Sequence, residues 1–456
     1  MNIALWEEIK KFDFDFPLSE YGFSTRLAYE NEWTTFFTQK AIEEYKKFMY
    51  LAATSNQMVS PSEIVDIVWH QHLIFTQSYK EFGDILGKKI EHIPSTHNRE
   101  EIDKFLAAKK RTKELYESVF GDQPKEFWEY NTFVEALEIE KSKRDITFYS
   151  SLSIPLVLIF VLLFRLFLYD LYVSIDNPYF VLFFILVSVA TFLGLHFYNT
   201  DKLYRKLSDT PNVILKNLTP SELIYIESGQ LKMIVHGYVN YLVVNKNLKV
   251  ETKDSIKLIN ANIDNSNPIF KSVLDCFKGK QTMSYKELLE TLIDKPIINK
   301  ASRAASSITK TFVNSKIVLD LYKVNLIALS SIMVFGLTRV FIGFIRGKEV
   351  IYIVILNAIF LFFALYFLRS FSKKAINKII VNYFKERIIP LNKSNYNNWE
   401  WNYFIIGTAL LSVSFMPIVQ TYSGNNNNFG CGSSCGSSCG SSCGSSCGGG
   451  CGGCGS

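Results

Sequence analysis

The chain has 456 residues, enough for two or three domains. Hydrophobic residues make up 48 % of it and phenylalanine occurs 37 times, which indicates very apolar runs diluted by polar domains. The formal net charge of +6 is too small for a nucleic-acid-coating surface and fits the basic flanks of membrane segments. Residues 1–16 contain Glu7, Glu8, Asp13 and Asp15 but no apolar run, so we expect no cleavable signal peptide.

Residues 1–140 predict a soluble helical domain. An amphipathic helical stretch covers 26–53. The string SPSE then predicts a helix start, with Ser60 as the N-cap and Glu63 as its capping-box partner. The helix that follows should carry the sequence IVDIVWHQHLIFTQSYKEFGDILG. A further helix is expected over 99–120.

Four of the six histidines fall in this domain, and histidine is the commonest metal ligand: His70, His72, His92 and His97. Residues two apart on a helix point about 200° from each other, which separates His70 from His72. Asp66 and His70 are four apart and share a face, and His92 can join them from the following loop. The candidate ligands, for zinc or copper, are Asp66, His70, His72 and His92. A buried hydrogen-bonding cluster and a catalytic site are the alternative interpretations.

This part of the chain carries a family resemblance. The string PSEIVDIVWHQHLIFTQSYKEFGDILGKKIEHIP resembles the glycine-rich domain-containing protein-like family of plants and bacteria. The family pattern is an acidic residue, Trp-His-x-His, a Tyr and a final His-x-Pro, matched here by Asp66, Trp69, His70, His72, Tyr79, His92 and Pro94. Many bacterial members have a second histidine where Glu91 stands. The resemblance covers roughly residues 20–130 and implies no established activity.

Four strongly apolar stretches predict two transmembrane hairpins. Each stretch is close to the length of about 20 residues that a helix needs to cross the bilayer. The first hairpin is predicted over 146–199, with Asp176, Asn177 and Pro178 in its turn. The second is predicted over 324–369.

One arginine lies inside each predicted hairpin, Arg165 in the first and Arg339 in the second. A central arginine costs about 3 kcal/mol, whereas each large aliphatic residue or Phe returns about 0.3–0.6 kcal/mol. The apolar residues therefore outweigh each arginine. Because both lie near the ends of their spans, we expect them to snorkel to the interface. A paired functional site within the membrane is the alternative.

Residues 200–320 predict a second soluble region. Thr219 and Glu222 form a capping-box pattern around Pro220, and a second helix is expected over 231–244. The string LKVETKDSIKLIN alternates like a small hairpin, so the order of elements is winged-helix-like. Such modules often bind DNA, but the second helix has one cation, and nucleic-acid binding needs many. A protein-contact module is the preferred interpretation.

The C-terminal part begins with a basic segment over 370–401 and continues with a fifth apolar stretch, predicted as a span over 402–420. Lys and Arg are concentrated before the first span, after the second and after the fourth. By the positive-inside rule the N-terminus is then cytoplasmic, and five crossings put the C-terminal tail outside. The predicted location is the cytoplasmic (inner) membrane of a bacterial cell.

Seven of the eight cysteines lie in a Gly/Ser-rich tail over 421–456: Cys431, Cys435, Cys439, Cys443, Cys447, Cys451 and Cys454. Gly and Ser cannot bury apolar surface, so the tail is predicted to be disordered. Its thiols are expected to oxidise or cross-link outside the cytosol. Binding of soft metals such as zinc or copper, and a neutral repeat without chemistry, are the alternatives.

The C-terminal two-thirds carries a second resemblance. The string LTPSELIYIESGQLKMIVHGYVNYLV, the flanking spans and the tail together resemble a bacterial membrane-protein family with a near-C-terminal Cys/Gly-rich segment. That family has Pro-x-Glu-Leu-Ala-Tyr-Leu followed by Gly-Gly, and this chain replaces the Ala by Ile224 and the first Gly by Ser228. The resemblance covers roughly residues 140–456 and implies no function.

The sequence therefore predicts a mainly α, multi-span membrane protein with two soluble regions and a disordered tail. No Walker-type loop, GxGxxG, HExxH or nucleophile elbow occurs. We expect a non-enzymatic scaffold or interaction protein whose partners are the lipid bilayer and other proteins. The alternatives are a metal-dependent enzyme or sensor that uses the N-terminal histidines, and a membrane-tethered DNA-binding regulator.

Overall fold

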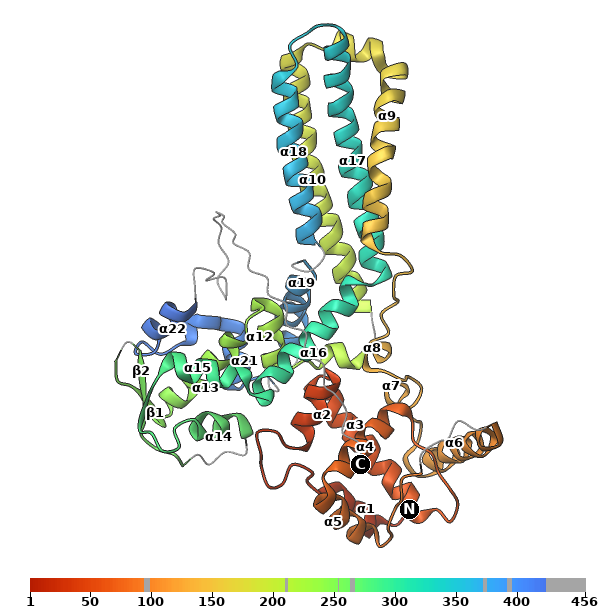
Figure 1. The fold of residues 1–456 in the computed structure, drawn as a ribbon, viewed down its shortest axis with the longest axis vertical. Helices are drawn as coiled ribbons and strands as arrows, with labels where there is room; N and C mark the ends of the chain where they lie inside the picture. Colours follow the sequence, from red (N-terminus) through yellow and green to blue (C-terminus); the bar gives the residue numbers. More distant parts are fainter. Residues whose placement is uncertain are drawn as a thin grey trace, which may run out of the picture.

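The computed structural model describes residues 1–93, 99–209, 212–252, 254–262, 267–371, 375–391 and 396–423. They form a bundle of four long helices standing on a soluble part, which we define as everything described outside that bundle (Figure 1). The mainly α membrane-protein class predicted from the sequence is confirmed. Pro94, His97 and the seven tail cysteines lie outside the described residues.

The N-terminal domain is built from short and medium helices. In order they are α1 (Ile3–Lys11), α2 (Phe23–Asn31), α3 (Thr35–Thr54), α4 (Glu63–Ile74), α5 (Thr76–Leu86), α6 (Arg99–Phe120), α7 (Lys125–Trp128) and α8 (Phe133–Ala136). The helix predicted over 99–120 is confirmed as α6.

Two helices expected to be continuous are divided. Glu32 adopts a left-handed conformation with φ 57°, which separates α2 from α3 within the stretch 26–53. Phe75 separates α4 from α5. The predicted N-cap Ser60 is wrong, because the side chain of Ser62 accepts the first-turn bond from the Val65 amide at 3.2 Å. A serine two residues later thus satisfies the free amides at the helix start.

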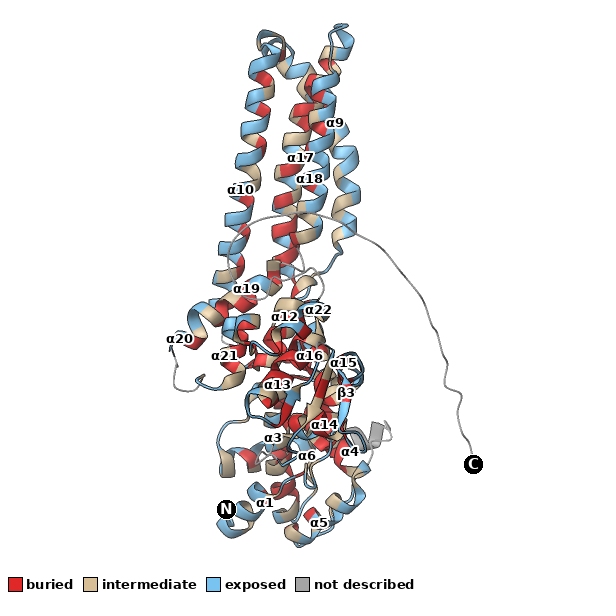
Figure 2. Ribbon diagram, turned by 90° about the vertical axis from the view of Figure 1, so that its left-hand side faces the viewer, coloured by how far each residue is buried: buried red, intermediate tan, exposed pale blue. Residues whose placement is uncertain are grey.

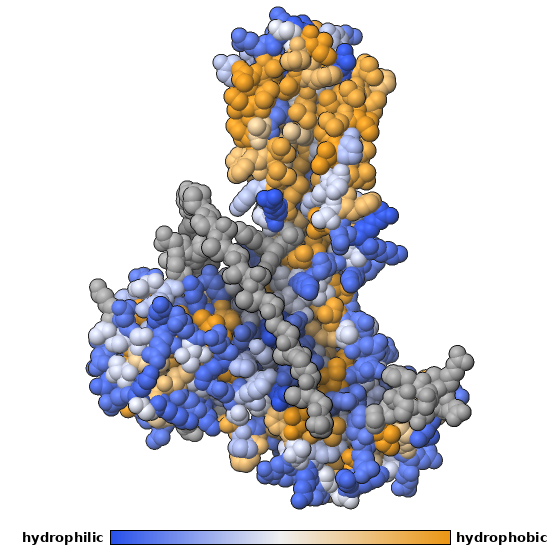
Figure 3. All heavy atoms as spheres, in the orientation of Figure 1, coloured by the Kyte–Doolittle hydropathy of each residue, from blue (hydrophilic) through white to orange (hydrophobic). Residues whose placement is uncertain are grey.

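The bundle consists of α9 (Ile146–Ser174), α10 (Asn177–Asp209), α17 (Lys316–Ile345) and α18 (Ile351–Ser370). Each is long and apolar enough to cross a membrane. Figure 3 shows apolar side chains over the outside of this bundle and mostly polar ones over the soluble part. Leu166 and Phe167 are 71 % and 81 % exposed, which in water would be unfavourable. The outer face of the bundle therefore fits a lipid environment.

Arg339 does not snorkel, contrary to the prediction. Its side chain is 8 % exposed and donates hydrogen bonds to the carbonyls of Tyr172 and Ile175 and to Oδ1 of Asn177. These acceptors lie at the end of α9 and the start of α10. The last carbonyls of a helix have no intrahelical partner, so Arg339 caps α9 from the neighbouring helix α17.

The middle domain combines helices with a small sheet. Its elements are α11 (Val213–Lys216), α12 (Pro220–Ser228), α13 (Leu231–Val244), β1 (Leu248–Val250), β2 (Ser255–Leu258), α14 (Pro268–Asp275), β3 (Thr282–Ser284), α15 (Tyr285–Asp294) and α16 (Pro296–Val313). The capping box of Thr219 and Glu222 is confirmed, as is the hairpin, in which Val250 pairs with Ile256. A third strand, β3, pairs antiparallel with β2 and was not expected.

The segment after the bundle corrects the prediction of a fifth span. It forms α19 (Ile376–Tyr383), a π-helical turn (Phe384–Ile388), α20 (Ile389–Leu391), α21 (Trp399–Ile406), a 3-10 turn (Gly407–Leu410) and α22 (Met416–Ser423). Gly407, with φ 69°, ends α21 after eight residues, far short of a crossing.

The apolar residues of 402–420 are buried in the soluble part instead of in lipid. Phe404, Phe415 and Ile418 are fully buried there. Tyr403 donates a hydrogen bond to the carbonyl of Met233 at 2.9 Å, which ties the segment to α13. The stretch is apolar because it belongs to a protein core, and composition alone does not separate that case from a short span.

The bundle and the soluble part share a core. The last turns of α10 contribute Leu203 and Leu207, and the first turns of α17 contribute Val318 and Leu321. Buried residues are concentrated in the soluble part and along the inner faces of the bundle (Figure 2). The two regions are therefore continuous in packing.

Candidate metal centre

The candidate site is built from α4 and the segment after α5. Asp66 and His70 are one turn apart on α4, so their side chains share a face, as predicted. The chain turns at Gly87, whose φ of 65° suits glycine, and runs back past α4. This return brings His92 next to Asp66.

Asp66 lies between the two histidines. Nε2 of His92 is 3.1 Å from Oδ1 of Asp66, and Nε2 of His70 is 3.3 Å from Oδ2. One ligand atom from each of the three residues lies within 4.8 Å of the other two. His92 is the most buried of the three side chains, at 17 % exposed, and His70 the most open, at 59 %.

A hydrogen-bonded chain holds the His92 segment in place. Nε1 of Trp69 donates to the hydroxyl of Tyr79 at 3.0 Å, and that hydroxyl donates to the carbonyl of Ile90 at 2.6 Å. The Trp69 ring also packs edge-on against His92, with centroids 4.6 Å apart. Two aromatic residues thus fix a backbone atom two residues before His92, as a supporting layer does at metal sites.

His72 does not belong to this cluster, as the helical geometry predicted. It is fully buried on the other face of α4, where Nδ1 is 2.9 Å from the Tyr45 hydroxyl and Nε2 is 3.2 Å from the Ser78 hydroxyl. Burial lowers its pKa to about 3, so the ring is neutral at physiological pH. His72 is a core residue, and naming it as a metal ligand was wrong.

The spacing of the three remaining groups suits a tetrahedral ion. Zinc binds nitrogen and oxygen ligands at about 2.0–2.1 Å, which separates neighbouring ligand atoms by about 3.3 Å. The two Asp66–histidine distances of 3.1 and 3.3 Å match this value. Two imidazoles and one carboxylate would leave a fourth position open, the arrangement of catalytic rather than structural zinc sites. Without an ion the same groups form a hydrogen-bonded cluster.

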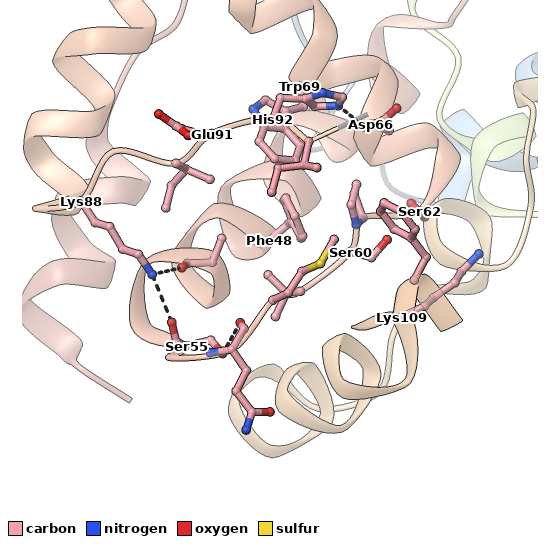
Figure 4. A pocket seen from close by; sticks show the side chains of 18 of the residues that line it. Phe48, Ser55, Ser60, Ser62, Asp66, Trp69, Lys88, Glu91, His92 and Lys109 are labelled. Carbon is pink, nitrogen blue, oxygen red and sulfur yellow. Dashed lines mark hydrogen bonds and ion pairs between the residues drawn. The ribbon is translucent and has the colours of Figure 1, made fainter. Parts of the chain in front are cut away.

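A cavity of about 710 Å³ adjoins the cluster (Figure 4). Asp66, Trp69 and His92 line one wall, and the loop between α3 and α4 with Ser60 lines another. Side chains of both charges line it as well, among them Lys88. A cavity of this size accommodates a small molecule. The sequence gave no signal for it, because α6 and the α3–α4 loop meet only in the folded chain.

The other candidate sites carry less. Helix α13 is buried along Met233–Asn240, so it cannot serve as an exposed DNA-recognition helix. Cys276, the cysteine outside the tail, is half-buried and donates to the Ser272 carbonyl, and burial raises the pKa of its thiol. Both observations agree with the interpretations made from the sequence.

Comparisons with protein-family models, with curated proteins and with solved structures find no match to this chain. The class that the fold defines is a mainly α membrane protein with four apolar helices and a large soluble part.

Proposed function

We propose that this membrane protein binds a zinc-class metal ion in its N-terminal domain, through Asp66, His70 and His92. The observation that carries the proposal is the convergence of three ligand atoms within 4.8 Å of one another. Imidazole and carboxylate ligands suit zinc and, with less selectivity, copper. The scaffold role expected from the sequence stays a prediction.

The adjoining cavity favours a metal-dependent enzyme or sensor over a purely structural site. Asp66 and His92 belong both to the ligand set and to the cavity wall, so a molecule in the cavity can reach the ion. In a structural site all four positions come from the protein, and here the described residues supply three.

We further propose that the chain crosses the membrane four times, with the N-terminal domain and α22 both on the cytoplasmic side. An even number of crossings returns the chain to its starting side. Lys141, Lys143 and Arg144 precede α9, whereas the turn between α9 and α10 has no Lys or Arg. The positive-inside rule then makes the soluble part cytoplasmic. The outward tail rested on the fifth span, so on this topology the tail is cytoplasmic too.

The test is metal analysis of the full-length protein, purified in detergent with a histidine-free affinity tag. We expect one zinc ion per chain, with binding at least about tenfold weaker in His70→Ala and in His92→Ala. His196→Ala is the matched control, because His196 is an exposed histidine on α10 outside the cluster. Metal-free wild-type protein after zinc loading, or equal loss in the control, would contradict the proposal.

A further inference from the structure

A second cavity, of about 510 Å³, lies between the N-terminal domain and the middle domain. It is separate from the cavity beside the metal ligands and shares no lining residue with it. One wall comes from α2, α3 and the segment before α2, and the other from α12, α13, α16 and α21. Hydroxyl groups are frequent in these walls: Ser24, Thr25, Thr35, Thr38, Ser221 and Tyr238. Cavities between domains are common places for small-molecule sites.

Lys300 is the one lysine among the residues that line this cavity. Within the described part of the chain, the hydrogen bonds and ion pairs of the structure include none from its ammonium group. The nearby carboxylates are engaged elsewhere: Asp15 accepts from the Ser24 amide at 2.9 Å, and Glu222 accepts from the Thr35 amide at 2.8 Å. Burial lowers the pKa of Lys300, and these two carboxylates raise it. An enclosed ammonium without a direct partner is costly unless something else binds it.

The start of α16 acts on the same volume. Ile297 and Ile298, in the first turn of this 18-residue helix, line the cavity, and no side chain caps the helix start. The N-terminal end of a helix carries partial positive charge and unpaired amides. Lys300 follows about one turn later on the same helix, so both features favour a negative group at this wall.

The opposite wall offers acceptors. Glu400, on α21, lines the cavity and accepts a hydrogen bond from the Tyr238 hydroxyl at 3.1 Å through one carboxylate oxygen. With the Ser and Thr hydroxyls, it can bind donors on a ligand. The cavity is thus positive at one wall and rich in acceptors at the other.

We propose that this interdomain cavity binds a small hydroxylated anion, a phosphate ester or a carboxylate, with its negative group at Lys300. The ligand's hydroxyl groups face Glu400 and the Ser and Thr side chains. Because the cavity walls come from both domains, binding also fixes the domains against each other. The site is independent of the proposed metal centre.

The test is calorimetric titration of the full-length protein in detergent with inorganic phosphate, with succinate and with neutral ribose. We expect saturable binding of phosphate or succinate, and much weaker binding of ribose. Phosphate binding identifies a phosphate ester as the ligand class, and succinate binding a carboxylate. Lys300→Met should weaken anion binding by about tenfold or more. Lys310→Met is the matched control, since Lys310 is an exposed lysine on the same helix.

Two results overturn the proposal. One is the absence of saturable binding of both anions by the wild-type protein, and the other is unchanged binding in Lys300→Met. If Lys300→Met does not fold, Lys300→Gln, which keeps a polar group, replaces it. The wild-type titrations decide the question in either case.

Discussion

Glu44 illustrates how single residues organise this protein. It lies in α3 at 4 % exposed, and its carboxylate accepts hydrogen bonds from the Tyr116 hydroxyl and from Nε1 of Trp128, each at 2.7 Å. Lys47 adds an ion pair at 2.7 Å. A buried charge is tolerated when it is fully bonded. The sequence gave no sign of this network, because its members lie on three helices far apart in the chain.

Two buried histidines make the folded state sensitive to acid. Burial lowers the pKa of His72 and that of His236 to about 3, against about 6.5 in an unfolded chain. Below about pH 6.5 the unfolded chain takes up protons that the folded chain does not. The free energy of unfolding is therefore highest above that pH and falls as the pH drops toward 3. At pH 5 we expect each histidine to lower it by about 2 kcal/mol.

Urea unfolding of the detergent-solubilised protein at pH 7.5 and pH 5.0 measures this loss. His72→Gln keeps a polar side chain but does not titrate, so it should reduce the difference between the two pH values by about 2 kcal/mol. His70→Gln, at an exposed position on the same helix, should leave the difference unchanged. Equal slopes in both variants would contradict a neutral, buried His72.

At the scale of elements, α17 depends on Arg339. Replacing Arg339 by Leu leaves the carbonyls of Tyr172 and Ile175 without their donor inside the bundle. We expect a loss of about 2–3 kcal/mol in the stability of the detergent-solubilised protein, measured by thermal unfolding.

Arg165→Leu is the matched control for Arg339→Leu. Arg165 is half-buried on α9, and its guanidinium lies 5.2 Å from the ring centroid of Phe341. Such a contact contributes about 1 kcal/mol or less at an accessible site. If the two substitutions cost the same, the capping role of Arg339 is wrong.

Close packing of α17 also depends on Gly336. A methyl group at this position would overlap Oδ1 of Asn357 and would lie 2.7 Å from a ring carbon of Phe184. Small residues let membrane helices approach closely. Gly336→Ala should therefore destabilise the bundle by about 1–3 kcal/mol in the same thermal assay.

Gly194→Ala tests whether that effect is specific. Gly194 lies in α10, and a methyl group there would meet no atom within 4 Å. Alanine is the better helix former, so this change should be neutral or stabilising by up to about 1 kcal/mol. A similar loss in both variants would show that packing at Gly336 is not the cause.

The sequence was informative about elements wherever a local rule decides the outcome. The apolar length of the four bundle helices and the capping box of Thr219 and Glu222 are local features, and both predictions are confirmed. The Asp66–His70 pair is also local, since it follows from the four-residue spacing on α4. The failures at 402–420 and at Arg339 have another cause. In both, the partners come from distant parts of the chain, which decide whether a segment faces lipid, water or protein.

At the scale of the whole molecule, four crossings put both ends of the chain on one side. A membrane-impermeant thiol reagent tests this in intact cells, after reduction, with single cysteines in a cysteine-free background. Asp176→Cys, exposed in the α9–α10 turn, should react before lysis. Glu8→Cys, exposed on α1, should react only after lysis.

The native tail is the decisive sample in this assay. In a chain that keeps the tail cysteines but carries Cys276→Ser, we expect labelling only after lysis, as for Glu8→Cys. Labelling of the tail together with Asp176→Cys would contradict four crossings and restore a fifth.

The length of α10 has a mechanical consequence. Its 33 residues extend about 50 Å, whereas the hydrocarbon layer is about 30 Å thick. The surplus reaches into the shared core with Leu203 and Leu207, so one stiff rod is anchored in two media. A thinner or thicker bilayer tilts such a rod. The tilt then arrives directly among the side chains that hold the cytoplasmic helices together, with no hinge in between to absorb it.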